Sequence, residues 1–256
     1  MVRDDLQSWL HVREKVDWTD VPHGLAGPIR GRRDGLLTAA ALRDTPGDST
    51  RGDRLRTAWE RARCDAAAGA CLGFHLLCEW QKLVLGLPDV GFRTLPAFAK
   101  AGRERYGLSA ETPRLFHGCL AESADMDVPL AGRAARVYLD VCFFHPFHDG
   151  NGRAALLALG FVLAREEVFL DEVGPIQVRR YADDPVGAAS LARVVHTLAM
   201  ATVRRSRSNQ PVEPPNSLCA ASVDLSARTR PVLRRAPEGG PLDPAGTEAA
   251  VTQERD

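Results

Sequence analysis

The sequence predicts an all-α fold, and two kinds of observation indicate it. Residues 154–164 contain no charged side chain and are long enough for a buried helix. Thr112-Pro113 and Asp184-Pro185 each place a helix-capping residue directly before a proline, the usual order at a helix start. Upstream of the buried segment, apolar residues recur at helical spacing at Leu130, Ala134, Val137, Tyr138, Val141 and Cys142.

The other elements follow in chain order. We expect a short amphipathic helix over 4–16, a Gly-, Pro- and Arg-rich connector over 21–35, a short helix over 36–43, a long helix over 54–85 kinked near Gly69 and Gly73, and a last helix from Asp184 to about Arg205.

These elements divide the chain into three parts. Residues 1–50 carry the N-terminal helices and the connector, residues 51–206 form the helical core, and residues 207–256 form a tail. The composition of the tail shifts abruptly to Pro, Ser, Gly, Arg and Glu, and its prolines recur too often for regular structure. We therefore expect the tail to be disordered.

Composition narrows the function classes. The chain has 33 basic and 33 acidic residues and no basic block, which argues against a nucleic-acid partner. No uninterrupted apolar run approaches the roughly 20 residues of a membrane span, and the first residues lack the apolar stretch of a signal peptide, so we expect a cytoplasmic protein with no membrane partner. The basic residues are nearly all arginine, which favours a bacterial, GC-rich gene.

The segment over residues 145–153 combines the groups that phosphoryl chemistry needs. His145 is the natural general base, because an unperturbed imidazole titrates near pH 6.5. Asp149 supplies a hard oxygen ligand, and Mg²⁺ is usually held by only one or two carboxylates together with waters and substrate phosphates. Arg153 can contact phosphate oxygens in a bidentate manner.

The glycines on either side of Asn151 predict an anion-binding turn. Gly150 and Gly152 lack Cβ atoms, so the backbone can adopt tight conformations and direct its N–H groups toward one point. The buried segment that follows should begin as a helix at about Asn151 or Gly152, and a helix N-terminus favours anions. The motif is therefore expected to be a helix-loop-helix.

These residues resemble the signature of the Fic family, His-Pro-Phe-x-[Asp/Glu]-Gly-Asn-Gly-Arg-x-x-Arg, at every specified position except the last. The resemblance implies a Fic-like helical bundle whose members mostly transfer AMP from ATP to a protein hydroxyl and release pyrophosphate. It implies that His145 deprotonates the target hydroxyl and that Asp149 holds Mg²⁺.

The resemblance also assigns the rest of the loop. It implies that Phe147 anchors the loop in the core and that Arg153 contacts phosphate. The phosphate-binding hole would be formed by Gly150, Asn151 and Gly152.

The departure from the signature is Leu156, which stands where the family usually has a second arginine. Either another cation takes the place of this arginine, or this chain binds its donor differently from the way in which family members bind ATP. The leucine could face the core, or it could lie at the edge of the donor site. We find no convincing copy of the inhibitory pattern Ser/Thr-x-x-x-Glu-Gly/Asn, since Arg234 occupies the Ser/Thr position before Glu238.

Family members also carry a β-hairpin flap upstream of the motif that holds the target segment. Its expected counterpart lies within about 88–102, where Phe92, Thr94 and Phe98 favour strand structure. The alternative is an irregular loop with both phenylalanines buried.

Three functions remain open. The first is Mg²⁺-dependent transfer of AMP from ATP to a hydroxyl of a target protein (AMPylation), with His145 as general base. The second uses the same site with another diphosphate donor or a small-molecule acceptor. The third is an inactive Fic scaffold that binds proteins, against which the intact base, carboxylate and glycines argue. The sequence leaves a homo-oligomer open.

Overall fold

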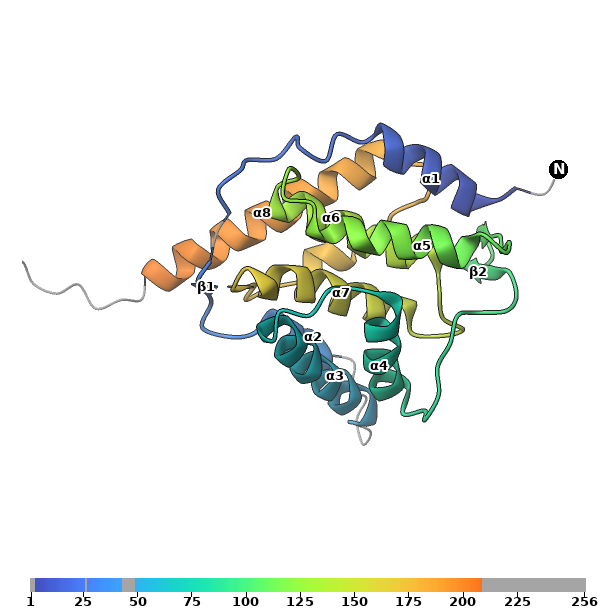
Figure 1. The fold of residues 1–256 in the computed structure, drawn as a ribbon. Helices are drawn as coiled ribbons and strands as arrows, with labels where there is room; N and C mark the ends of the chain where they lie inside the picture. Colours follow the sequence, from blue (N-terminus) through green and yellow to red (C-terminus); the bar gives the residue numbers. More distant parts are fainter. Residues whose placement is uncertain (1–2, 26, 43–48, 209–256) are drawn as a thin grey trace, which may run out of the picture. The chain divides into compact units, whose positions relative to one another are not determined.

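The computed structural model describes residues 3–25, 27–42 and 49–208. Their helices are α1 (Asp5–Lys15), α2 (Gly35–Ala41), α3 (Thr50–Ala67), α4 (Phe74–Leu85), α5 (Thr112–Ala121), α6 (Leu130–Phe144), α7 (Asn151–Arg165) and α8 (Pro185–Arg207), with short 3₁₀ turns at Glu122–Ala124 and Gly174–Gln177. The strands are two short pairs: β1 (Ile29–Arg30) is parallel to β4 (Val168–Phe169), and β2 (Ala97–Ala99) is antiparallel to β3 (Glu104–Tyr106). The predicted all-α fold with a small hairpin is confirmed (Figure 1). The predicted tail lies almost wholly outside the described residues.

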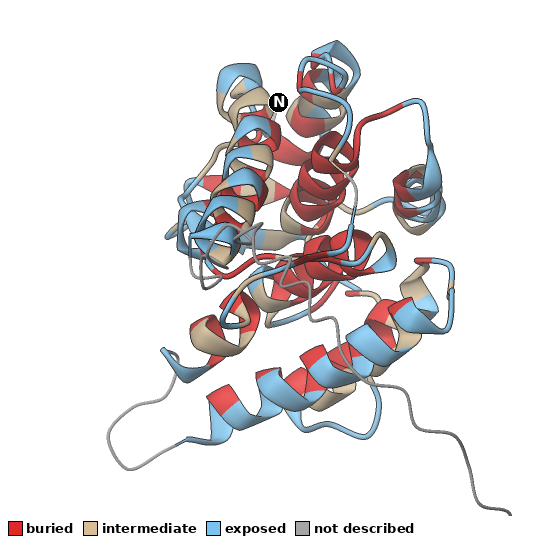
Figure 2. Cartoon of the chain, turned by 90° about the vertical axis from the view of Figure 1, so that its left-hand side faces the viewer, coloured by how far each residue is buried: buried red, intermediate tan, exposed pale blue. Residues whose placement is uncertain are grey.

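The motif helices α6 and α7 lie at the centre of the domain. They pack against each other, α3 covers α7, and α8 covers α6. Nearly every residue of α6 and α7 is buried, and Figure 2 shows the buried residues gathered on the central helices. Gly160 allows the close approach of α3, because a Cβ at this position would lie 2.8 Å from the ring of Trp59. The site loop is therefore held between two rigid helices.

The prediction of one helix over residues 54–85, kinked near Gly69 and Gly73, is wrong, although the break lies where the kink was expected. The structure has two helices, because Gly69 adopts a left-handed conformation (φ 73°) just after α3 ends. The amide of Ala70 donates to the carbonyl of Asp65 at 3.0 Å, which closes a Schellman-type cap. The indole N–H of Trp80 then donates to the Asp65 carboxylate at 2.8 Å and ties α4 back against α3.

The hairpin lies further along the chain than predicted. Only β2 falls within 88–102, and β3 follows the turn at Gly102 (φ 81°). Residues before β2 form an irregular segment in which Phe92 packs against Phe74 with 5.3 Å between ring centroids. Phe98, in β2, is 64% exposed, so the alternative of a loop with both phenylalanines buried is also wrong.

Helix α8 is long and apolar enough, by length and composition, to cross a membrane. In this domain it packs against α6 and α1, and its residues Leu191, Val195 and Ala199 are fully buried. Packing within the domain thus accounts for its apolar face. The side chain of Asp184 accepts from the amide of Gly187 at 2.8 Å and caps the helix, as the sequence predicts.

Candidate active site

The signature residues form the loop between α6 and α7. Helix α6 ends at Phe144, and its C-cap His145 adopts a left-handed conformation (φ 49°, ψ 54°) while the amide of His145 still donates to the carbonyl of Val141 at 3.2 Å. Pro146 follows and cannot continue the helix. Such a backbone conformation is unfavourable for a residue with a Cβ.

His145 is prepared to accept a proton. Its Nδ1 lies 3.2 Å from the carbonyl oxygen of Cys142, and since a carbonyl can only accept, Nδ1 carries the hydrogen and Nε2 keeps its lone pair. The ring stacks on Tyr106 of β3 with 5.4 Å between centroids and 28° between planes. The side chain is half-buried, and burial lowers the pKa of His145 below its ordinary value. The imidazole is therefore neutral near pH 7.

The loop is anchored in the core at Phe147 and Asn151. Phe147 is 1% exposed and stacks on Phe74 of α4 with 5.6 Å between centroids. The buried side chain of Asn151 makes two hydrogen bonds to the backbone of Phe147: Oδ1 accepts from its amide at 2.9 Å, and Nδ2 donates to its carbonyl at 2.8 Å. The amide side chain of Asn151 is thus used to shape the loop, while its backbone N–H opens α7.

Two further residues hold the loop, and sequence reasoning missed both. Gln81 of α4 is fully buried, and its Nε2 donates to the carbonyl of Asp149 at 2.6 Å. Arg93 is 3% exposed; its guanidinium donates to the carbonyls of Leu95 and Gly107, and its own amide donates to the carbonyl of Pro146 at 2.8 Å. A buried arginine bonded to carbonyls has no local sequence signal.

The predicted site residues come together around one cavity of about 720 Å³. Its lining includes His145, Phe98, Arg51 and the predicted residues Asp149, Gly150, Asn151, Gly152 and Arg153. The first N–H groups of α7 have no acceptor within the helix and favour an anion here. Gly150 is required at the turn because its φ is 76° and a Cβ would lie 2.4 Å from Gln81.

The two charged residues of the loop contact each other. A terminal nitrogen of Arg153 lies 3.3 Å from the carboxylate of Asp149, and its other terminal nitrogen donates to the carbonyl of Val84 at 3.2 Å. The Asp149 side chain is 79% exposed and thus accessible to a cation. Among the described residues, no group of three or more His, Cys, Asp or Glu side chains could hold a metal.

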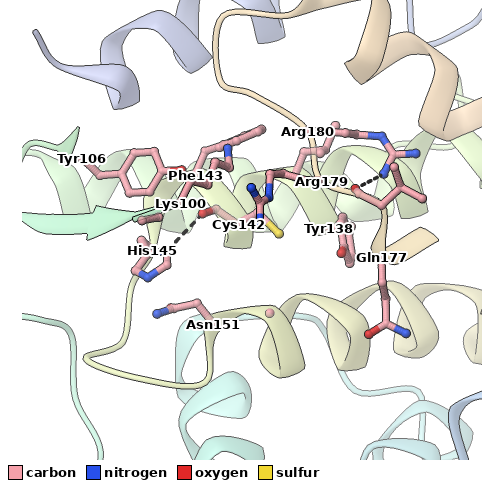
Figure 3. A pocket seen from close by; sticks show the side chains of 14 residues that line it. Lys100, Tyr106, Tyr138, Cys142, Phe143, His145, Asn151, Gln177, Arg179 and Arg180 are labelled. Atoms are coloured by element: carbon pink, nitrogen blue, oxygen red, sulfur yellow. Dashed lines mark hydrogen bonds between the residues drawn. The ribbon is translucent and has the colours of Figure 1, made fainter. Parts of the chain in front are cut away.

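A second, smaller cavity of about 180 Å³ adjoins the first (Figure 3). His145, Asn151 and Gly152 line both cavities. The labelled side chains come from the hairpin, from α6 and α7, and from residues 177–180, and they include the rings of Tyr106, Tyr138 and Phe143. The basic side chains of Lys100, Arg179 and Arg180 also line the smaller cavity, so both cavities carry positive charge and the smaller one adds aromatic rings.

Leu156 faces the core. It is 0% exposed in the second turn of α7 and lines neither of these cavities. Of the two orientations left open by the sequence, the structure shows the buried one.

Comparison with known proteins identifies the domain. Residues 75–163 match the model of the Fic/DOC family. The chain resembles a solved Fic-1 fragment from C. elegans with 17% identity and a TM-score of 0.51, over 80% of this chain and 73% of that chain. This likeness concerns the fold. The chain thus carries a Fic/DOC family domain.

Two other solved structures are similar at lower scores. A Fic domain containing signaling protein from Bacteroides thetaiotaomicron is 15% identical, with a TM-score of 0.48 over 80% of this chain and 91% of that chain. IbpAFic2, solved covalently tethered to Cdc42, is 15% identical with a TM-score of 0.47 over 77% and 70%. No curated protein matches the chain.

Proposed function

We propose that this chain transfers AMP from ATP, in the presence of Mg²⁺, to a hydroxyl side chain of a target protein. The observation that carries the proposal is the position of His145: a half-buried imidazole, whose pKa is lowered by burial, borders a cavity formed by a helix N-terminus, a glycine turn, an arginine and a carboxylate. A base beside an anion site is the arrangement that nucleotidyl transfer to a hydroxyl requires.

The chemistry follows from the arrangement. Nε2 of His145 takes the proton of the target hydroxyl, whose oxygen then forms a bond to the α-phosphorus of the donor. The bond between that phosphorus and the oxygen bridging to the β-phosphate breaks, and pyrophosphate leaves with the electron pair. The α7 N–H groups and Arg153 stabilise the negative charge that develops on the phosphates.

Asp149 is the residue that would hold the metal. Its carboxylate is exposed at the cavity, and a single carboxylate suits Mg²⁺, which draws its other ligands from water and substrate phosphates. When bound, the ion neutralises phosphate charge. Arg153 would then exchange its contact with Asp149 for a contact with phosphate.

The smaller cavity fits the nucleoside. Aromatic rings line it beside the basic side chains of Lys100, Arg179 and Arg180, and it shares Asn151 and Gly152 with the anion cavity. A donor with its phosphates at the α7 N-terminus would place its base among these rings, with the α-phosphate near His145. The hairpin, whose Phe98 projects into the anion cavity, would contact the target segment.

Intact-mass analysis tests the proposal. The chain is incubated with Mg²⁺, candidate acceptor proteins or a cell extract, and each of ATP, GTP, CTP, UTP and a nucleotide-linked diphosphate. AMP transfer predicts an increment of one adenylyl group, with ATP alone. A different mass increment would favour the second function, in which the site uses another donor. The burial of Leu156 keeps this function open. No increment with any donor would contradict transfer to a protein and would favour a small-molecule acceptor or the inactive scaffold.

A further inference from the structure

The stability of α3 does not explain why residue 51 is an arginine. Arg51 is the second residue of α3, and the positive end of the helix dipole disfavours a cation in the first turn. The side chain is exposed and lines the anion cavity together with Asp149 and the residues of the α7 N-terminus. It therefore brings a positive charge to the cavity from an element outside the motif.

The charged side chains that line the anion cavity indicate a binding role for Arg51. Among the residues that the structure describes, the lining of this cavity includes the guanidinium groups of Arg51 and Arg153 and the carboxylate of Asp149. Arg153 and Asp149 contact each other at 3.3 Å, so their opposite charges offset each other, and Arg51 adds a further positive charge to the cavity. Besides Arg153, the one basic residue of α7 is Arg165, which lies at the far end of the helix and donates to the carbonyl of Ala70.

We propose that Arg51 binds the terminal phosphates of the donor and stays in contact with the pyrophosphate that leaves. A guanidinium can donate two parallel hydrogen bonds to phosphate oxygens, so one such residue both neutralises and orients the group. The inference rests on the proposed function, since it takes the cavity as the donor-phosphate site. Under this proposal, Arg51 of α3 supplies the positive charge that Leu156 lacks.

Calorimetry on the full chain with Mg²⁺ tests the inference with three probes: ATP, pyrophosphate and AMP. Arg51→Ala should weaken binding of ATP and of pyrophosphate by about 10- to 100-fold, the loss expected for one charge-assisted contact. AMP, which lacks the terminal phosphates, should bind equally to both forms. The unfolding midpoint should stay equal or rise, because a cation leaves the helix N-terminus.

Arg56→Ala is the matched control. Arg56 is an exposed arginine on the same helix, pairs with Asp53 at 3.7 Å and does not line the cavity, so its loss should leave all three affinities unchanged. The inference is overturned if Arg51→Ala binds ATP and pyrophosphate within twofold of the wild type, or if both arginine variants weaken binding equally. If the wild type binds neither ATP nor pyrophosphate, the proposed function itself fails. If the wild type binds both and Arg51→Ala binds them equally well, only the inference about Arg51 fails.

Discussion

The side-chain amide of Asn151 forms a closed ring of two hydrogen bonds with the backbone of Phe147, at 2.9 and 2.8 Å. Both residues are buried, so the ring fixes the start of α7 relative to the end of α6 without help from solvent. The backbone N–H groups of the turn are thus held in place before any anion binds.

Asn151→Ala should therefore destabilise the domain as well as the site. It leaves the amide and carbonyl of Phe147 unpaired in the interior, and each such group costs about 1–3 kcal/mol. Urea denaturation measures the loss. His148→Ala, at an exposed position of the same loop, should unfold at the wild-type midpoint. Equal midpoints for both variants and the wild type would show that the ring does not hold the loop.

The pH profile of turnover should report the environment of His145. Burial lowers the pKa of its imidazole, so the neutral, proton-accepting form persists below the ordinary value of about 6.5 and is lost only as the pH falls through the lowered pKa. The rate at saturating nucleotide should stay level from pH 8 to about 6.5 and decline below it. A decline that is half complete above pH 6.5 would mean that another group limits the rate.

Leu156→Arg should damage the fold rather than restore a donor contact. The side chain at this position is fully buried, and an unpaired charge there costs several kcal/mol. Leu156→Met, which keeps volume and polarity, should cost less than about 1.5 kcal/mol. Thermal unfolding and ATP titration of both variants decide the matter. A stable arginine variant with tighter ATP binding would contradict the buried orientation.

The assignment of the smaller cavity to the nucleoside can be tested at its exposed rim. Val178 lines this cavity and is 62% exposed, so Val178→Trp should fold normally and fill part of the space. The variant should bind ATP at least tenfold more weakly and pyrophosphate as the wild type does. Val186→Trp, at a 72% exposed position of α8 that does not line the cavity, is the control. Unchanged ATP affinity in Val178→Trp would place the base elsewhere.

The site was more predictable from sequence than the fold around it. His145, Asp149 and Arg153 lie within nine consecutive residues, so their proximity follows from local geometry, and the structure places them around one cavity. The helix starts at Asn151 and Pro185 also follow from local signals, a glycine turn and a capping aspartate.

Features that depend on contacts distant in sequence were not predictable in the same way. The glycines predict a kink near Gly69 and Gly73, but not that the left-handed backbone of Gly69 ends α3 and separates it from α4. The bonds from Gln81 to Asp149 and from Arg93 to Gly107 connect segments that the sequence does not relate. The expected range of 88–102 ends the hairpin at Gly102, whereas Gly102 lies in the turn between β2 and β3.

The most direct test of AMP transfer follows the label from each end of ATP. The chain is incubated with Mg²⁺, a cell extract as the source of acceptor, and ATP labelled at either the α- or the γ-phosphate, in parallel with the His145→Ala variant. We predict that only the α-label becomes covalently bound to protein, that the γ-label leaves as pyrophosphate, and that His145→Ala transfers neither although it still binds ATP. Retention of the γ-label on protein, or transfer of the α-label by His145→Ala within tenfold of the wild type, would contradict the proposed reaction or its base.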